Sequence, residues 1–149
     1  MNRLKLVDVF DVDTLKDDFR ATLIAPSNAG KTEYLLYLLS EIVSVYRYIF
    51  LIVPTINDKY ARYIWPNHMF LVETVQQINE VIETIMKFAS NQTKLGHKKK
   101  ILVITDDLGS MTADKSCKID RLLYRGRGIG ISVLILAQSY QMISPNMRN

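Results

Sequence analysis

Short apolar runs alternate with longer amphipathic segments along most of this chain. Each short run is nearly continuous in Val, Ile, Leu and Phe, as strands buried on both faces of a sheet are. These runs predict strands at 21–25, 48–53, 69–72, 101–105 and 132–137. Between them, apolar residues recur every three or four positions, which predicts helices at 31–46, 74–89 and 115–124. We therefore expect an α/β fold of three layers, with helices on both faces of a central, mostly parallel sheet.

Two of the connecting segments have an unusual composition. Residues 90–100 are polar and include a glycine, so we expect an exposed loop there. Residues 54–66 interleave Tyr60, Tyr63 and Trp65 with cations. This pattern suits either stacking on nucleic-acid bases or packing of a short helix onto the sheet. We favour packing, because three aromatic residues at this spacing more often belong to a core.

The segment after the first predicted strand has the composition of a phosphate-binding loop. Its sequence APSNAGKT, residues 25–32, matches the pattern G-x-x-x-x-G-K-[ST] except that Ala25 replaces the first glycine. A buried strand before the loop and a helix after it argue against a chance turn. In such loops backbone N–H groups bind phosphates, the lysine reaches the β- and γ-phosphates, and the last hydroxyl binds Mg²⁺. The residues predicted to bind the nucleotide are Ser27, Asn28, Ala29, Gly30, Lys31 and Thr32.

Two adjacent carboxylates, Asp106 and Asp107, follow the apolar run ILVIT. Ligands of open α/β sheets bind at the carboxyl ends of the strands. We expect Asp106 to hold Mg²⁺, and Asp107 to act as the base or to position the water that attacks the γ-phosphate. The alternative is a turn or a helix N-cap, for which Asp is a preferred residue. The loop upstream favours the catalytic interpretation.

Gln138 comes directly after the last predicted strand, where its amide would sense the γ-phosphate, orient water or satisfy a turn. Before that strand, the stretch DRLLYRGRGIG presents three arginines among glycines. Arginine stabilises charge in phosphoryl transfer when a neighbouring subunit supplies it. The same side chain would contact DNA phosphates or only solvent. Arg127 is our first candidate for such an arginine, and Arg148 is the second.

Composition indicates one globular domain. The 149 residues are 48% hydrophobic and 23% charged, which suffices for one core, so we predict a single P-loop domain over 1–149 with residues 1–19 before its first strand. The net charge of +4 suits an anionic partner without requiring one. Cys117 is alone and the two histidines are far apart, which excludes an internal disulfide and a zinc cluster.

The chain has no apolar stretch long enough for a membrane helix and no signal-peptide pattern, so we expect a soluble, intracellular protein. It ends a few residues after the last predicted strand. That ending leaves open whether the domain is truncated or is completed by another chain.

Four parts of the sequence in this order resemble the packaging ATPases of large DNA viruses, including the poxvirus type, within the FtsK/HerA group of P-loop motors. These parts are APSNAGKTEYLL, FLIVPTIN followed by YIWP, ILVITDDLG, and YRGRGIGISVLILAQSYQMISPNMRN. The resemblance runs from about residue 20 to the last residue. Two positions depart from the family pattern, which usually has Gly in place of Ala25 and often His in place of Gly128.

This resemblance implies an ATP- and Mg²⁺-dependent oligomeric ring, commonly a hexamer, that moves double-stranded DNA into a capsid. Lys31 and Thr32 then have the Walker A roles, Asp106 and Asp107 the Walker B roles, and Gln138 the sensor role. The fold would be a P-loop NTPase with an additional strand between the P-loop and Walker B strands. Capsid proteins would be partners, and the host-cell cytoplasm or the virion would be the location.

Two other functions remain open from the sequence. One is a small nucleoside or nucleotide kinase, which shares a P-loop but needs an acceptor site and lid arginines. The other is a nucleotide-dependent DNA-binding or assembly subunit without turnover of its own. The carboxylate pair after an apolar strand favours the motor over the kinase.

Overall fold

The computed structural model describes residues 18–96, 100–139 and 141. In chain order, the strands and α-helices are β1 (Arg20–Ile24), α1 (Lys31–Ile42), β2 (Tyr48–Val53), β3 (Met69–Leu71), α2 (Val75–Lys94), β4 (Ile101–Asp106), α3 (Ile119–Arg125) and β5 (Ile131–Ala137). Short 3₁₀ turns connect them at η2 (Asp58–Arg62), η3 (Pro66–His68), η4 (Gly109–Ala113) and η5 (Gly126–Ile129).

The five strands form one sheet in the order β1-β5-β4-β2-β3. Each neighbouring pair is parallel, so among the described residues the sheet is wholly rather than mostly parallel. In the chain, β2 and β3 come between β1 and β4. In the sheet, β5 lies between β1 and β4 instead. The predicted α/β fold is confirmed. Because all strands run the same way, their carboxyl ends meet at one edge.

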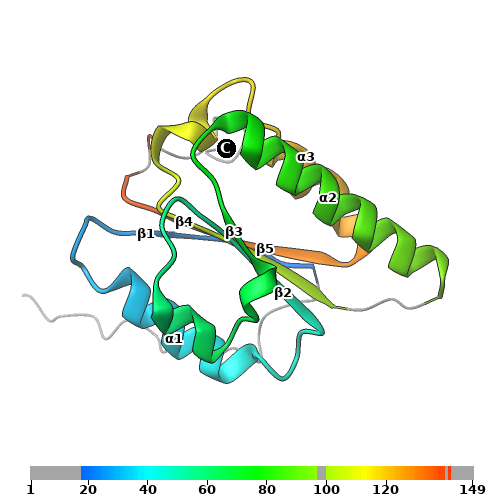
Figure 1. Ribbon diagram of the computed structural model, residues 1–149, viewed down its shortest axis with the longest axis horizontal. Coiled ribbons are helices and arrows are strands. Elements are labelled where there is room, and N and C mark those ends of the chain that lie inside the picture. The colour runs from blue at the N-terminus through cyan, green and yellow to red at the C-terminus, as the bar shows by residue number, and fades with distance from the viewer. Residues whose placement is uncertain (1–17, 97–99, 140, 142–149) are drawn as a thin grey trace, which may run out of the picture.

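Helices cover both faces of the sheet, as Figure 1 shows: α1 lies on one face, and α2 and α3 lie on the other. The central strands β2, β4 and β5 are buried almost throughout. Alternate residues of each strand enter different cores, because successive side chains point to opposite faces. Leu102 and Ile104 pack with α1, whereas Ile101 and Val103 pack with α2 and α3.

Two predicted helix ends are wrong. The first helix ends at Ile42 rather than at residue 46. The second helix begins at the capping box of Thr74 and Gln77 and continues to Lys94, five residues beyond the predicted end, so the first five residues of the predicted loop are helical. Its polar last turn is compatible with a helix because most of those side chains face solvent, and the Thr93 hydroxyl donates to the Ala89 carbonyl.

The third predicted helix, at 115–124, is also corrected. The helix is the shorter α3, Ile119–Arg125. Before it, the Asp114 carboxylate accepts hydrogen bonds from the backbone N–H and the hydroxyl of Ser116. Aspartate that bonds to the backbone two residues later favours a turn over a helix, so the chain turns here first.

The three aromatic residues after β2 have different environments. The prediction that they pack into a core holds for Tyr60, which is 2% exposed, but is wrong for Trp65, which is 73% exposed. Tyr63 is half-buried. His68 lies in the turn before β3, and its ring contacts those of Tyr48 and Phe50.

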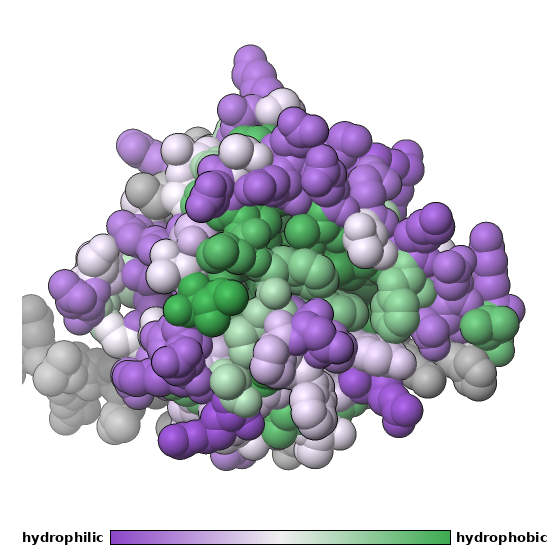
Figure 2. Space-filling view, viewed as in Figure 1, coloured by the Kyte–Doolittle hydropathy of each residue, from purple (hydrophilic) through white to green (hydrophobic). Residues whose placement is uncertain are grey.

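An apolar groove lies at the β3 edge of the sheet, beside α2. Apolar side chains gather there between polar ones on the face shown in Figure 2. The groove has a volume of about 410 Å³, and Leu71, on its rim, is 53% exposed. In the part of the chain that the structure describes, no helix has both the length and the apolar character needed to cross a membrane.

Candidate functional site

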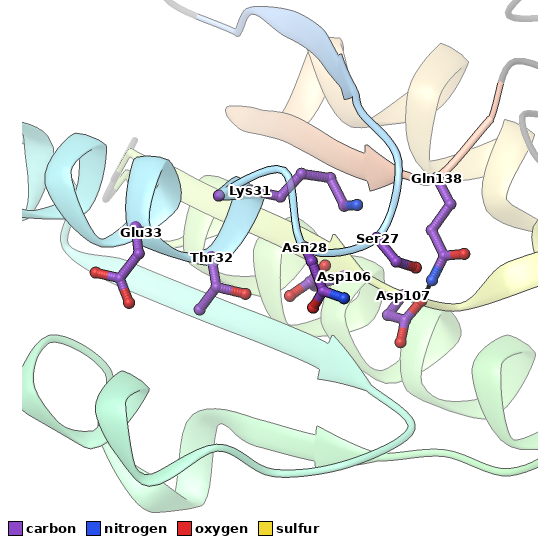
Figure 3. A pocket seen from close by; sticks show the side chains of 9 residues that line it. Ser27, Asn28, Lys31, Thr32, Glu33, Asp106, Asp107 and Gln138 are labelled. Carbon is purple, nitrogen blue, oxygen red and sulfur yellow. Dashed lines mark hydrogen bonds between the residues drawn. The ribbon is translucent and has the colours of Figure 1, made fainter.

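A cavity of about 450 Å³ opens at the carboxyl edge of the sheet. Figure 3 shows its side chains converging from the loop after β1, the end of β4 and the end of β5. Most of the residues predicted to bind or act on a nucleotide line it. The lining residues are Ser27, Asn28, Gly30, Lys31, Thr32, Glu33, Asp106, Asp107 and Gln138.

The loop owes its shape to two residues in the left-handed backbone region. Asn28 has φ 60° and Gly30 has φ 86°. Asn and Gly tolerate this region better than other residues, because a short polar side chain or a missing Cβ lowers the steric cost. Ala25 is not among the residues with positive φ, and its N–H donates to the Ala137 carbonyl at 3.1 Å. Alanine at the first loop position therefore costs the backbone nothing.

Helix α1 begins at the cavity, and among the described residues no side chain caps it at Gly30. The first N–H groups of a helix have no partner within the helix, so this end is suited to bind an anion. The Lys31 ammonium donates to the carbonyl oxygens of Ala25, at 2.5 Å, and Pro26, at 3.0 Å. Ala29 belongs to the loop but does not line the cavity, and its N–H donates to Pro26 at 3.3 Å.

Asp106 ends β4 and is only 8% exposed. The hydroxyl of Tyr60 donates a short hydrogen bond to Asp106 Oδ2. Burial raises the pKa of Asp106, and the nearby charge of Asp107 raises it further, while the bond from Tyr60 and the charge of Lys31 oppose the rise. Burial likewise raises the pKa of Tyr60, and its hydrogen bond to Asp106 raises that pKa by the next largest amount.

Asp107 turns the chain away from β4 with φ 56° and is exposed at the cavity. The Gln138 side-chain amide donates to Asp107 Oδ1 at 2.7 Å. These two residues come from neighbouring strands, since β4 pairs with β5 and both strands end at this edge. The structure thus brings together the two residues for which the sequence predicted a role toward the γ-phosphate.

The candidate arginines lie elsewhere. Arg127 belongs to η5, before β5, whereas Gln138 follows β5. The seven residues of β5 separate them by roughly 23 Å at about 3.3 Å per residue. Arg121 instead pairs with Glu83 of α2. Arg127 therefore faces the amino edge of the sheet, and Arg148 lies outside the described residues.

The cavity has the donor set that Mg²⁺ prefers. Within the described ranges, no group of three His, Cys, Asp or Glu side chains could hold a metal ion. The Thr32 hydroxyl and the Asp106 carboxylate are hard oxygen donors on one cavity. Mg²⁺ usually takes one or two protein carboxylates and completes its shell with water and substrate phosphates, so these residues fit that ion when a nucleotide brings it.

Two residues of the site were missed by the sequence interpretation. Glu33 lines the cavity and accepts a bond from Lys59 at 2.7 Å. Tyr60 was assigned to core packing, and it does pack there, but its hydroxyl also reaches Asp106. No local pattern in the sequence signals this contact, because it depends on β2 lying beside β4 in the sheet.

Several known proteins are similar to this chain. DNA packaging protein OPG160 of Variola virus is 35% identical over 136 residues, which cover 87% of this chain and 49% of that protein. OPG160 of Vaccinia virus, strain Copenhagen, gives the same values, and OPG160 of Monkeypox virus is 35% identical with 44% of its length covered. The chain therefore spans about half the length of these relatives.

Two further comparisons concern the fold and the family. The pCW3 conjugation coupling protein TcpA, solved as a monomer with ATPγS, aligns with a TM-score of 0.54 at 14% identity, over 89% of this chain and 47% of TcpA. At that identity the likeness concerns the fold alone. The family profile of the poxvirus A32 protein matches residues 8–149, and this chain belongs to that family.

Proposed function

We propose that this chain is the ATP-hydrolysing part of a motor that moves double-stranded DNA. The observation that carries the proposal is one cavity with four features. It is lined by the start of α1, which no side chain of the described residues caps, by the loop that contains Lys31, by Asp106, and by the hydrogen-bonded pair of Asp107 and Gln138. Phosphoryl transfer depends almost entirely on positioning and on charge stabilisation, and these groups supply both.

Each group has a distinct task in this proposal. The loop and the start of α1 bind the phosphates through backbone N–H groups. Lys31 leaves the carbonyls of Ala25 and Pro26 for the β- and γ-phosphates, which are stronger partners because they are charged. Thr32 and Asp106 hold Mg²⁺, which neutralises charge on the phosphates. Asp107 accepts the proton of the attacking water, and Gln138 orients the carboxylate of Asp107 through its amide.

DNA enters the proposal through the relatives. OPG160, which is 35% identical to this chain, is named a DNA packaging protein. We infer from this name that the substrate moved is DNA that is being packaged. The resemblance to packaging ATPases of large DNA viruses supports the further proposal of a viral genome, an oligomeric ring, capsid partners and the host cytoplasm. The excess of positive charge, +4 for the chain, is compatible with a polyanionic substrate.

The test is the rate of ATP hydrolysis with and without double-stranded DNA, on protein whose oligomeric mass is known. We expect DNA to raise the rate. Lys31→Ala should lower the rate about a hundredfold, since it removes one preorganised donor to the transferring phosphoryl group. The matched control is Lys87→Ala, which removes an exposed lysine of α2 outside the cavity and should leave the rate unchanged.

Two results would redirect the proposal. If the protein hydrolyses ATP but does not bind DNA, and DNA does not raise the rate, the motor is contradicted. Tight ATP binding with no hydrolysis, in protein of any oligomeric state and with DNA present, would instead favour the nucleotide-dependent assembly subunit.

A further inference from the structure

The hydroxyl of Tyr60 lies at the two groups expected to hold Mg²⁺. It donates to Asp106 Oδ2, and the Thr32 hydroxyl interacts with the same phenol. Neither the loop nor β4 contributes Tyr60, which belongs to η2, the 3₁₀ turn that follows β2 in the chain. A third element therefore reaches the metal-binding groups from inside the core.

Tyr60 is tied closely to the exposed segment that follows it. Its carbonyl accepts hydrogen bonds from the N–H groups of Tyr63, at 3.0 Å, and Ile64, at 2.9 Å. Trp65 is the next residue, and it is largely exposed. The ring of Tyr60 thus reaches the metal-binding groups while its backbone holds the residues just before Trp65.

The same segment has a second connection to the site. Lys59 donates to Glu33, which neighbours Thr32 at the start of α1. The side chain of Asn57 accepts from the Lys59 N–H at 3.0 Å and so fixes the beginning of η2. Residues 57–65, which we term the η2 segment, are joined to the nucleotide site through both Tyr60 and Lys59.

We propose that Tyr60 is a positioning residue whose hydroxyl occupies the metal-binding groups in the nucleotide-free protein and is released when Mg²⁺ arrives with the nucleotide, so that the η2 segment changes position with nucleotide state. This inference rests on the proposed function, because it requires Mg²⁺ and a nucleotide at this cavity.

The Tyr60 hydroxyl and Mg²⁺ would compete for Asp106 because of the coordination geometry of the ion. Mg²⁺ demands near-octahedral oxygen ligands at about 2.0–2.1 Å and keeps several waters around it. Asp106 is buried, so few directions remain from which its carboxylate can be approached. The Tyr60 phenol already holds one of the two carboxylate oxygens, so the ion or one of its waters has to compete with that hydrogen bond.

The experiment compares the unaltered protein with Tyr60→Phe and with the matched control Tyr63→Phe. Both substitutions remove one hydroxyl from the same segment, but only Tyr60 bonds to Asp106. Two quantities are measured with ATPγS bound: the apparent Kd for Mg²⁺, and the change in tryptophan fluorescence as Mg²⁺ is added. The sequence contains one tryptophan, Trp65, so the signal reports on the η2 segment alone.

We expect the fluorescence of the unaltered protein and of Tyr63→Phe to change on adding Mg²⁺. In Tyr60→Phe the hydroxyl no longer competes, so Mg²⁺ should bind about tenfold more tightly, as the loss of a hydrogen bond to a charged group implies. Its Trp65 fluorescence should no longer respond to Mg²⁺, because the bond that the ion would break is absent from the start.

Three results would overturn the inference while leaving the proposed function intact: weaker Mg²⁺ binding by Tyr60→Phe, equal behaviour of the two variants, or unaltered protein that binds Mg²⁺ and ATPγS with no change at Trp65. The third needs no variant, so the inference stays testable even if Tyr60→Phe folds poorly. Failure of the unaltered protein to bind ATPγS at all would contradict the proposed function, and this inference with it.

Discussion

Burial governs the behaviour of the Asp106 carboxyl group. Its pKa is raised in the folded protein, so the folded state holds this proton more tightly than the unfolded state does. Its contribution to stability is therefore complete below the ordinary pKa of aspartate and is lost as pH rises through the raised value. We expect Asp106→Asn to increase the free energy of unfolding at neutral pH, and the increase to vanish in acid.

Urea denaturation at a series of pH values measures this effect. Asp114→Asn is the control, because hydrogen bonds from Ser116 lower the pKa of exposed Asp114 and its substitution should bring no gain at neutral pH. An Asp106→Asn variant that is less stable than the unaltered protein at neutral pH would show that the carboxylate is held there by favourable contacts.

The left-handed conformation of Gly30 can be tested in the same way. No atom lies within 4 Å of a Cβ built at Gly30, so Gly30→Ala should cost only the backbone strain at φ 86°, about 1–2 kcal/mol. Gly128 has equally open surroundings without a left-handed φ, and Gly128→Ala should change the free energy of unfolding little. Equal values for the two variants would contradict this explanation.

Among the helices, α2 offers a prediction about its capping box. The Thr74 hydroxyl accepts from the Gln77 N–H at 3.2 Å, and the Gln77 side chain accepts from the Thr74 N–H. Thr74→Ala should lower the free energy of unfolding by about 1 kcal/mol, because a helix donor loses its partner. Nucleotide binding should stay the same, since α2 does not line the cavity.

Thr84→Ala is the matched control within α2. The Thr84 hydroxyl donates to the Glu80 carbonyl, which already belongs to the helix, so its loss should change stability by a few tenths of a kcal/mol at most. If thermal unfolding shows Thr84→Ala to be as damaging as Thr74→Ala, capping does not explain the start of α2.

The elements were predictable to different degrees. The continuous apolar runs of β2, β4 and β5 identified buried strands within a residue of their bounds, because such runs have few other uses in a domain of this size. Helix ends were less predictable. Polar residues at the end of α2 fit a loop or an exposed helix turn equally well, and only the packing of the preceding turns on the sheet selects the helix.

The candidate site also combines features that local patterns predict with features that depend on the packing of distant elements. Local patterns predicted a phosphate-binding loop, and the ends of β4 and β5 predicted Asp106, Asp107 and Gln138, which the structure brings to one cavity with that loop. The bond from Tyr60 to Asp106 joins residues 46 positions apart and depends on β2 lying beside β4. No local pattern records that neighbourhood, so the hydroxyl of Tyr60 could not be told from a packing aromatic residue.

For the whole molecule, the position of Arg127 makes a prediction about assembly. Because it lies at the opposite edge of its own sheet, it can act on a γ-phosphate only in a neighbouring copy. We expect Lys31→Ala and Arg127→Ala each to lose hydrolysis, and a mixture of the two to recover part of it. In the mixture some sites join an intact Lys31 to an intact Arg127 from the other subunit.

The rate of the mixture should exceed the average of the two separate rates, after subunit exchange has been verified by mass. Arg125→Ala is the control for Arg127→Ala. Arg125 is also exposed but is not our candidate, so this variant should retain hydrolysis without being mixed with another. A mixture no faster than its components would exclude Arg127 as the arginine supplied between subunits.

The pairing of β1 has a consequence for how the domain folds. In the described sheet β1 pairs only with β5. Arg20 is opposite Val133 there, so the paired residues are separated by most of the sequence. Contacts between such distant residues form slowly, because a long loop must close before they are made. The strand that leads into the phosphate-binding loop should therefore join the sheet late in folding and leave early in unfolding. A nucleotide that bound only the completed cavity would then slow unfolding from this edge, and the protein would be more resistant to proteolysis when loaded than when empty.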